Sequence, residues 1–440
     1  MKNISSIFKL LALTAALQYG FKPVFASSDE VKDKFELTYK VSASDKLVLN
    51  MYDSDLQINT WKSNEVKLTG EIIISNGSKE DIDKILAAFK NPKVEQGGGS
   101  IEINTVFSEG TIKIMGFYEK TKLTTGESVS TSSFKATYAI WVPESIAFNL
   151  KSKYNSVKSA SLLGSIDFDL YNVDVEMGDF GDKSVFETKY STVNAGKGKD
   201  AKFNIYDSKF VFDELNKVIV TSKYSKFTSK SINLLVLDSY NDTYNIENLK
   251  GVDMDAKYTT LNAKGTSNLG KFTLYNCNVE VGSFAKVEFD SKYSEFDAAS
   301  VGSFAIKTSY NDAYTINELN DITCENSKYN KFHLGTVSSS VNLPSCYDSE
   351  ISVQKIAPTF TSFKGDFKYG SVKLNVDPAL NYRLICNSTY GKINYPRERF
   401  KNRPLVYIEK DSKIELDCST STDAKCEFNF IAYDLNFTIQ

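Results

Sequence analysis

The residues of this sequence best suited to bind a ligand are lysines that each stand directly before a tyrosine. Stacked ammonium groups interleaved with aromatic rings could hold an acidic polysaccharide or an anionic envelope surface through charge and cation–π contacts. The alternative is structural, because surface lysines keep strands soluble and discourage pairing between sheets. The lysines concerned are Lys153, Lys189, Lys223, Lys257, Lys292, Lys328 and Lys368.

Residues for catalysis are sparse in the chain. The main enzymatic alternative is a polysaccharide lyase or hydrolase built on a β-helix, whose chemistry needs a base and paired carboxylates or an arginine in one groove. Carboxylate pairs occur, as in Asp167-Phe168-Asp169, but every arginine lies at or beyond Arg383 and the only histidine is His333. Common catalytic and phosphate-binding motifs are missing. We therefore predict a protein that is not an enzyme and needs no cofactor.

Two further residue types could do chemistry. Asn241-Asp242 and Asn311-Asp312 carry oxygen ligands that suit Ca²⁺, although Asn and Asp also close turns, and we predict no metal site. Six cysteines lie in the second half of the chain without a C-x-x-C pair. A polar, loop-like segment separates Cys418 from Cys426 between two alternating runs, which predicts a hairpin and a disulfide between them. The other cysteine pairings stay open.

The lysines belong to a repeat whose most regular member is tyrosine. Successive tyrosines are 16 to 22 residues apart, and self-similarity at a short period is typical of a solenoid. The first thirteen form two alternating classes: in one a lysine precedes the tyrosine, and in the other Asn or Asp follows it. The fourteen tyrosines are Tyr154, Tyr171, Tyr190, Tyr206, Tyr224, Tyr240, Tyr258, Tyr275, Tyr293, Tyr310, Tyr329, Tyr347, Tyr369 and Tyr390.

Apolar residues recur at constant offsets from these tyrosines. The third residue after each tyrosine of the first class is apolar, and so are the fourth and sixth after each tyrosine of the second class. A spacing of two places both side chains on one face of a strand. Short strands without helices between them cannot form a doubly wound sheet, whereas coils that stack satisfy every strand edge except those at the ends. We therefore predict an all-β fold, a parallel β-solenoid (β-helix), with one coil per tyrosine or one per pair of tyrosines.

The sequence divides into four segments. Residues 1–26 have the lysines, apolar run and small residues of a secretory signal. Residues 27–145 form an N-terminal β-rich cap domain with one short helix near 79–90, residues 146–397 the solenoid repeats, and residues 398–440 a C-terminal cap. No later run is long enough to be a transmembrane segment. The signal segment predicts an exported protein of the periplasm or cell surface. The net charge of −3 predicts a protein that binds no nucleic acid.

The order of these segments resembles a known family. An exported segment with Asp55-Leu56-Gln57-Ile58, a short helix, and Trp141-Val142-Pro143 leading into repeated short strands is similar to the bacterial putative-adhesin family of β-strand-repeat proteins. The chain departs from that family in placing tyrosine with Asn, Asp, Ser or Thr where relatives usually have a turn glycine. The resemblance implies an adhesin-like binding or scaffold module whose partner is a glycan or an envelope protein, and it supplies no catalytic residues.

Overall fold

The computed structural model of the chain describes residues 30–42, 44–114, 118–400 and 404–440, so the expected signal segment 1–26 lies outside the described residues. The chain forms two compact units. Among the described residues, the smaller comprises residues 30–35, Gly70–Pro92 and Val106–Thr137, and the larger comprises Glu36–Thr69, Lys93–Thr105 and Tyr138–Gln440.

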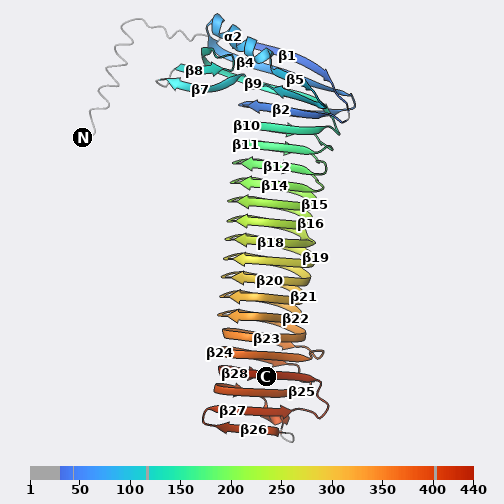
Figure 1. Cartoon of the computed structure of the whole chain (residues 1–440), viewed down its shortest axis with the longest axis vertical. Coiled ribbons are helices and arrows are strands. Elements are labelled where there is room, and N and C mark those ends of the chain that lie inside the picture. Colours follow the sequence, from blue (N-terminus) through green and yellow to red (C-terminus); the bar gives the residue numbers. More distant parts are fainter. Residues whose placement is uncertain (1–29, 43, 115–117, 401–403) are drawn as a thin grey trace, which may run out of the picture. The chain divides into compact units, whose positions relative to one another are not determined.

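Most described residues are in strands (Figure 1). The N-terminal elements are β1 (Glu30–Lys40), β2 (Lys46–Tyr52), β3 (Ser54–Trp61), β4 (Glu65–Gly77), α2 (Lys79–Lys90), β5 (Lys93–Gly97), β6 (Ser100–Asn104), β7 (Ser108–Ile114), β8 (Tyr118–Leu123) and β9 (Ser128–Pro143). The following elements are β10 (Ala147–Ser159), β11 (Ile166–Met177), β12 (Ser184–Lys189), β13 (Thr192–Ala195), β14 (Ala201–Tyr206), β15 (Lys209–Lys223), β16 (Lys226–Tyr240), β17 (Thr243–Leu249), β18 (Gly251–Lys257), β19 (Thr260–Tyr275) and β20 (Asn278–Lys292). The last are β21 (Glu295–Tyr310), β22 (Ala313–Lys328), β23 (Lys331–Ile356), β24 (Ser362–Val376), β25 (Tyr382–Asn394), a 3₁₀ turn (Arg397–Phe400), β26 (Pro404–Lys410), β27 (Lys413–Ser419) and β28 (Cys426–Ile439).

The smaller unit contains the helix expected from the sequence. The Ser78 hydroxyl caps the start of α2 by accepting the Asp81 N–H at 3.0 Å, and the helix ends at Asn91. On its buried side, the Phe89 ring packs edge-on against Phe35 and Phe107, with centroid separations of 5.1 and 5.7 Å. The predicted helix at 79–90 is therefore confirmed.

The larger unit is the predicted parallel β-solenoid, with about 13 turns. Each strand pairs in parallel with the equivalent strand of the next coil, as in Figure 1, where the coils from β10 to β24 lie one above another. The register decides the question of coil length. Lys189 pairs with Tyr206 and Tyr206 pairs with Lys223, 17 residues further along each time, so one coil contains one tyrosine.

The apolar positions expected to face the core are buried. Val157, Val175, Val193, Phe210 and Phe227 occupy one register column inside the solenoid and are each at most 2% exposed. Phenylalanines also stack between coils, as Phe186 does on Phe203 at 5.0 Å. At about 25 cal/mol for each Å² of apolar surface removed from water, such a continuous core holds the coils together.

The chain does not finish the stack in sequence order. β28 pairs in parallel with β24 on one side and with β25 on the other. β27 then pairs antiparallel with β25, and β26 pairs antiparallel with β27, giving the order β24, β28, β25, β27, β26 seen in Figure 1. The C-terminal strand therefore fills a coil that the chain skipped between β24 and β25.

This arrangement corrects the hairpin expected for Cys418 and Cys426. The two cysteines lie on β27 and β28, which are separated by β25, so the hairpin expected to join them does not form. Two strand spacings amount to about 10 Å, beyond the reach of a disulfide between Cα atoms. Both thiols are free and buried. The disulfide stays a prediction, although the hairpin on which that prediction was based is absent.

The stack also extends past the expected limits of 146 and 397. At its N-terminal end, β2 and β3 pair in parallel with β10, and β2 also pairs with β6. At the other end β28 belongs to the stack. The division into a cap, repeats and a second cap stays a prediction about domains.

Candidate functional site

The seven lysines share one column of the solenoid with tyrosines of the second class. At the end of the strand before one corner, the outward position alternates between lysine and tyrosine from coil to coil. Lys223 pairs with Tyr240, Tyr240 with Lys257, and Lys257 with Tyr275. The lysines are exposed and recur in every second coil, about 10 Å apart. We call them the lysine column.

The next residue forms the corner and has a left-handed backbone. Here tyrosines of the first class alternate with Asn or Asp, as in Tyr258 (φ 57°), Asn276 (φ 53°) and Tyr293 (φ 60°). Asn and Asp tolerate this conformation, as expected from sequence. Tyrosine does not favour it, and a left-handed residue with a Cβ costs about 1 kcal/mol. A favourable interaction must therefore offset the cost of the left-handed tyrosine in every second coil.

The offset comes from ring packing along the corner. Tyrosines of the two classes alternate in one continuous row, each ring meeting the next edge to face at centroid separations of 5.4 to 5.8 Å. Such pairs contribute about 0.5–1.5 kcal/mol each. We call this row the tyrosine ridge; in spatial order it comprises Tyr154, Tyr171, Tyr190, Tyr206, Tyr224, Tyr240, Tyr258, Tyr275, Tyr293, Tyr310, Tyr329, Tyr347, Tyr369, Tyr433 and Tyr390.

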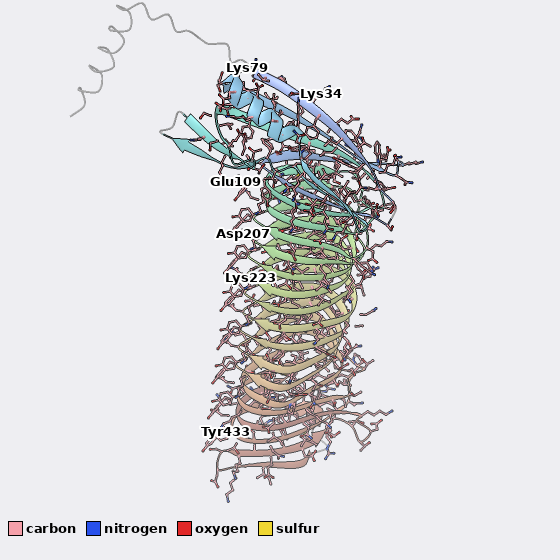
Figure 2. The ribbon with its side chains drawn as sticks, turned by 45° about the horizontal axis from the view of Figure 1, so that its top comes forward. Lys34, Lys79, Glu109, Asp207, Lys223 and Tyr433 are labelled. Atoms are coloured by element: carbon pink, nitrogen blue, oxygen red, sulfur yellow. The ribbon has the colours of Figure 1, made fainter. Side chains whose placement is uncertain are left out.

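The ridge is open to solvent along its whole length. Eleven of its fifteen tyrosines are 37% to 52% exposed. Asp207 and Lys223, in adjacent coils, and Tyr433, in a distant coil, lie along the same side of the solenoid (Figure 2). Desolvation by neighbouring rings raises the pKa of the Tyr258 and Tyr293 phenols, and adjacent tyrosines raise it further. These two hydroxyl groups are therefore protonated at neutral pH and can donate hydrogen bonds.

A buried column of hydroxyl groups supports the corner from inside. From Ser191 to Ser349, with Cys277 as the exception, the residue after the left-handed position points inward, and its oxygen accepts the backbone N–H of the equivalent residue in the preceding coil. Ser191 donates in this way to Ser208 at 3.1 Å, and Ser208 to Ser225 at 3.2 Å. Each hydroxyl also donates to the carbonyl two residues earlier, as Ser208 does to Tyr206 at 2.8 Å. Because these corner N–H groups are satisfied internally, the ridge keeps a regular geometry over these coils.

The lysine column carries charges that other side chains do not neutralise. Within the described part of the chain, ion pairs join other lysines, such as Lys197 with Glu214 and Lys230 with Asp213, and none involves the seven column lysines. Lys368 instead lies 6.0 and 5.8 Å from the ring centroids of Tyr347 and Tyr369. Carboxylates stand two residues earlier on several of the same strands; this acidic column comprises Asp169, Glu187, Asp238, Asp255, Asp290 and Asp366.

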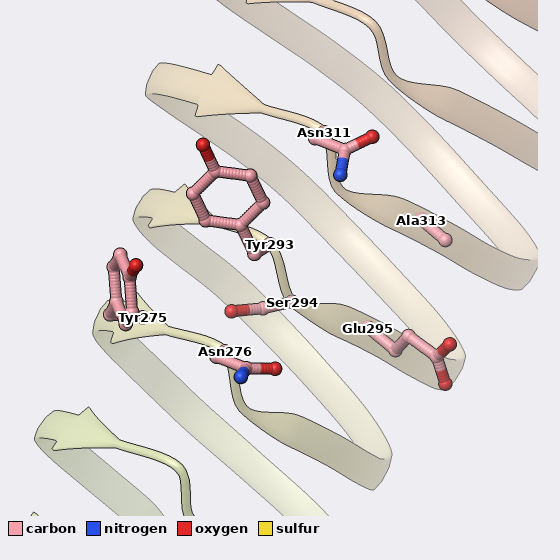
Figure 3. Close-up of a pocket in the computed structure, with 7 residues that line it drawn as sticks. All are labelled: Tyr275, Asn276, Tyr293, Ser294, Glu295, Asn311 and Ala313. Carbon is pink, nitrogen blue, oxygen red and sulfur yellow. The ribbon is translucent and has the colours of Figure 1, made fainter.

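Shallow recesses flank the ridge on both sides. On the left-handed side, the short Asn or Asp leaves space between protruding tyrosines. One such recess of about 540 Å³ is lined by Tyr275, Asn276 and Tyr293, and Figure 3 shows the amide of Asn276 beside the two rings. A second of about 540 Å³ lies beside Tyr190 and Tyr224. On the lysine side, a groove of about 670 Å³ is lined by Lys189, Lys223 and Glu187, among others.

The aspartates considered for calcium face the core instead. Asp312 is 3% exposed and accepts the Ser294 N–H at 2.7 Å, the Ser309 hydroxyl at 2.8 Å and the Tyr310 N–H at 3.1 Å. Asp242 occupies the same position and is hydrogen-bonded in the same manner. Burial raises the pKa of both carboxyl groups. Their oxygens therefore accept hydrogen bonds from the backbone N–H and serine hydroxyl groups at the corner of the solenoid.

The other groups singled out from the sequence are dispersed. His333 is exposed on β23, and Arg383 forms an ion pair with Asp417 at 2.7 Å. Asp167 accepts a hydrogen bond from Asn149 at 3.0 Å. Among the described residues, no group of three or more His, Cys, Asp or Glu side chains could hold a metal ion. In that same part of the chain, no helix has the length and apolar character needed to cross a membrane.

Two members of the repeat were missed because they lie far from the others in sequence. Tyr433 is followed by Asp434 in the left-handed conformation (φ 54°), and it fills the ridge between Tyr369 and Tyr390. Tyr52 pairs with Lys153 and is followed by Asp53 (φ 54°), and the Lys153 ammonium lies 4.9 Å from the Tyr52 ring centroid. The signal was present: the fourth and sixth residues after each of these tyrosines are apolar, as in the second class.

The sequence matches no protein-family model and no curated protein. Among solved structures, one that resembles it is a putative cell adhesion protein from Clostridium sporogenes, with 10% identity and a TM-score of 0.17, covering 93% of this chain and 100% of that one. Another is a putative adhesin from Bacteroides fragilis, with 9% identity and a TM-score of 0.16, covering 92% and 96%. These scores are too low to inform the function of this chain. The β-solenoid itself is consistent with the putative-adhesin resemblance noted from sequence.

Proposed function

We propose that this protein is a non-enzymatic, adhesin-like binding module of the bacterial cell envelope that holds a glycan along the tyrosine ridge. The observation that carries the proposal is the unbroken row of fifteen tyrosines, eleven of them exposed, flanked by lysines without ion pairs. A row of aromatic rings this long is an unusual expanse of exposed apolar surface, and such surfaces mark interaction sites.

The ridge has the chemistry that sugars need. The C–H faces of pyranose rings pack on aromatic rings, and their hydroxyl groups need polar partners close by. Tyr293 presents its ring face-on beside the edge-on ring of Tyr275 in Figure 3, and the Asn276 and Asn311 amides and the Ser294 hydroxyl line the same recess. Aromatic contact and hydrogen-bonding groups therefore occur together in one recess.

The expected location of the protein supports a glycan as the partner. Residues 1–26 read as a secretory signal, and envelope polysaccharides are abundant outside the cytoplasm. An envelope protein remains the other partner proposed from the sequence, and a periplasmic scaffold without an external ligand is the competing role.

Binding to immobilised polysaccharides tests the proposal. The variant Tyr224→Asn/Tyr258→Asn/Tyr293→Asn removes three rings but keeps a residue that suits the left-handed corner, as Asn does in alternate coils. It should lose most glycan binding while remaining folded by circular dichroism. The matched control is Leu163→Asn/Leu234→Asn/Leu269→Asn, which removes exposed apolar side chains outside the ridge. If both triple variants bind glycans as the native protein does, the ridge is not the binding surface.

Proteolysis of intact cells tests the location. A protein at the surface should be cleaved by added protease, whereas one in the periplasm should be cleaved only after the outer envelope is opened. Full protection on intact cells would rule out an exposed adhesin and favour the scaffold. A screen for depolymerisation of acidic polysaccharides tests the lyase or hydrolase alternative, and turnover abolished by one carboxylate substitution would overturn the non-enzymatic proposal.

A further inference from the structure

We infer that the ligand is a linear polysaccharide lying parallel to the solenoid axis, with one carboxylate in each disaccharide. This inference rests on the proposed function, because it assumes that the tyrosine ridge binds a glycan. It adds the direction of the ligand, the length of its repeating unit and its charge density.

The direction and repeat length follow from the two-coil period of the surface. Both the lysine column and the left-handed tyrosines recur in every second coil. Two coils rise by about 10 Å, which is comparable with one disaccharide of an extended polysaccharide. A chain parallel to the axis would therefore meet the same set of groups at each disaccharide: one ammonium group, two tyrosine rings and one corner amide or carboxylate.

The charge density follows from the two charged columns. One unpaired ammonium group per two coils can neutralise one carboxylate per repeat. The acidic column, with Glu187, Asp255 and Asp290 two residues before Lys189, Lys257 and Lys292, would repel a ligand with additional negative charges. A polymer with a charge on each sugar, or a nucleic acid with its denser phosphates, fits this surface less well.

The closed ladder of the solenoid also argues against an extended peptide. Peptides that recognise sheets usually add a strand to an open edge. At the ridge, each backbone edge is already paired with neighbouring coils, as in the bond from the Tyr258 N–H to the Tyr275 carbonyl at 3.0 Å. Recognition here must use side chains, which suits a sugar polymer.

Calorimetry with the full chain and three sets of oligosaccharides tests the inference. The sets are hyaluronan, with one carboxylate per disaccharide, polygalacturonate, with one on each sugar, and neutral cello-oligosaccharides. We expect hyaluronan to bind best, with affinity rising as disaccharides are added until the lysine column is spanned. The variant Lys223→Gln/Lys257→Gln/Lys292→Gln should weaken hyaluronan binding about tenfold, since it removes three exposed charge pairs that each contribute modestly. The charge-matched control Lys217→Gln/Lys250→Gln/Lys264→Gln, at exposed sites outside the column, should not.

The outcomes separate this inference from the proposed function. Affinity that stops rising after one disaccharide would overturn the axial orientation. Tighter binding of polygalacturonate would overturn the matched charge density, and an unaffected lysine-column variant would overturn the role of the lysines. Cello-oligosaccharide binding that depends on the ridge tyrosines, without preference for hyaluronan, would overturn the inference but keep the proposed function. Failure of all three sets to bind would count against both.

Discussion

Substitution of Tyr258 tests whether ring packing offsets the strained corner. Tyr258 has φ 57° and packs against Tyr240 and Tyr275 at 5.4 and 5.7 Å. Alanine removes both ring contacts, at about 0.5–1.5 kcal/mol each, and so should cost about 1–3 kcal/mol. It keeps a Cβ in the left-handed conformation. Glycine loses the same contacts but avoids about 1 kcal/mol of backbone strain. Tyr258→Gly should therefore be more stable than Tyr258→Ala by up to about 1 kcal/mol.

This order is the reverse of the usual one, since glycine in a strand is normally less stable than alanine by about 0.5–1 kcal/mol. Asparagine should resemble glycine because it occupies the same corner position in alternate coils, as at Asn276. It also controls for the extra freedom that glycine adds to the unfolded chain. The stability of Tyr258→Asn relative to Tyr258→Ala therefore measures the free-energy cost of the left-handed backbone.

Urea denaturation of the full chain gives the overall order of stability. Repeat proteins can unfold in parts, so hydrogen exchange of the coil around Tyr258 should be measured as well, including its N–H bonded to the Tyr275 carbonyl. The reasoning is refuted if alanine is as stable as glycine and asparagine, or if losing the ring leaves stability unchanged.

Three further predictions concern the supports of the ridge. Ser208→Ala removes the acceptor of the buried Ser191 N–H and should cost about 1–3 kcal/mol in urea denaturation, whereas Ser208→Thr, which keeps the oxygen, should cost less. Burial raises the pKa of the Asp312 carboxyl, so the folded state holds this proton more tightly than the unfolded chain does. The contribution of this carboxyl group to the free energy of unfolding is present in acid and falls as pH rises from about 4 through the raised pKa. Asp312→Asn should remove that fall in the free energy of unfolding. An Asp312→Asn variant with the pH profile of the native protein would contradict this prediction. A chain ending at Ser419 lacks β28 but keeps β27, so hydrogen exchange should show lost protection at the β24 amides that pair with β28 while β20 and β21 stay protected; unchanged protection of those β24 amides would show that β25 can pair directly with β24.

Features that repeat locally could be predicted from the amino-acid sequence alone. The two tyrosine classes and their apolar offsets predicted the solenoid and its buried positions, such as Val193 and Phe210, because side chains two apart share one face of a strand. The helix at Lys79–Lys90 was also predicted from a local signal, since its capping serine and apolar spacing lie within a few residues. The lysine column was found as a set of residues, and its binding role stays a prediction.

The tertiary structure decided whatever depends on register between distant segments. Coil length required the pairing of Lys189 with Tyr206, which composition does not reveal. Only long-range pairing brings Tyr433 between Tyr369 and Tyr390. The same cause separates Cys418 from Cys426, because β25 takes the place of the expected hairpin partner. Local patterns specify which face of a strand is buried, whereas the choice of neighbouring strand depends on the free energy of the whole stack.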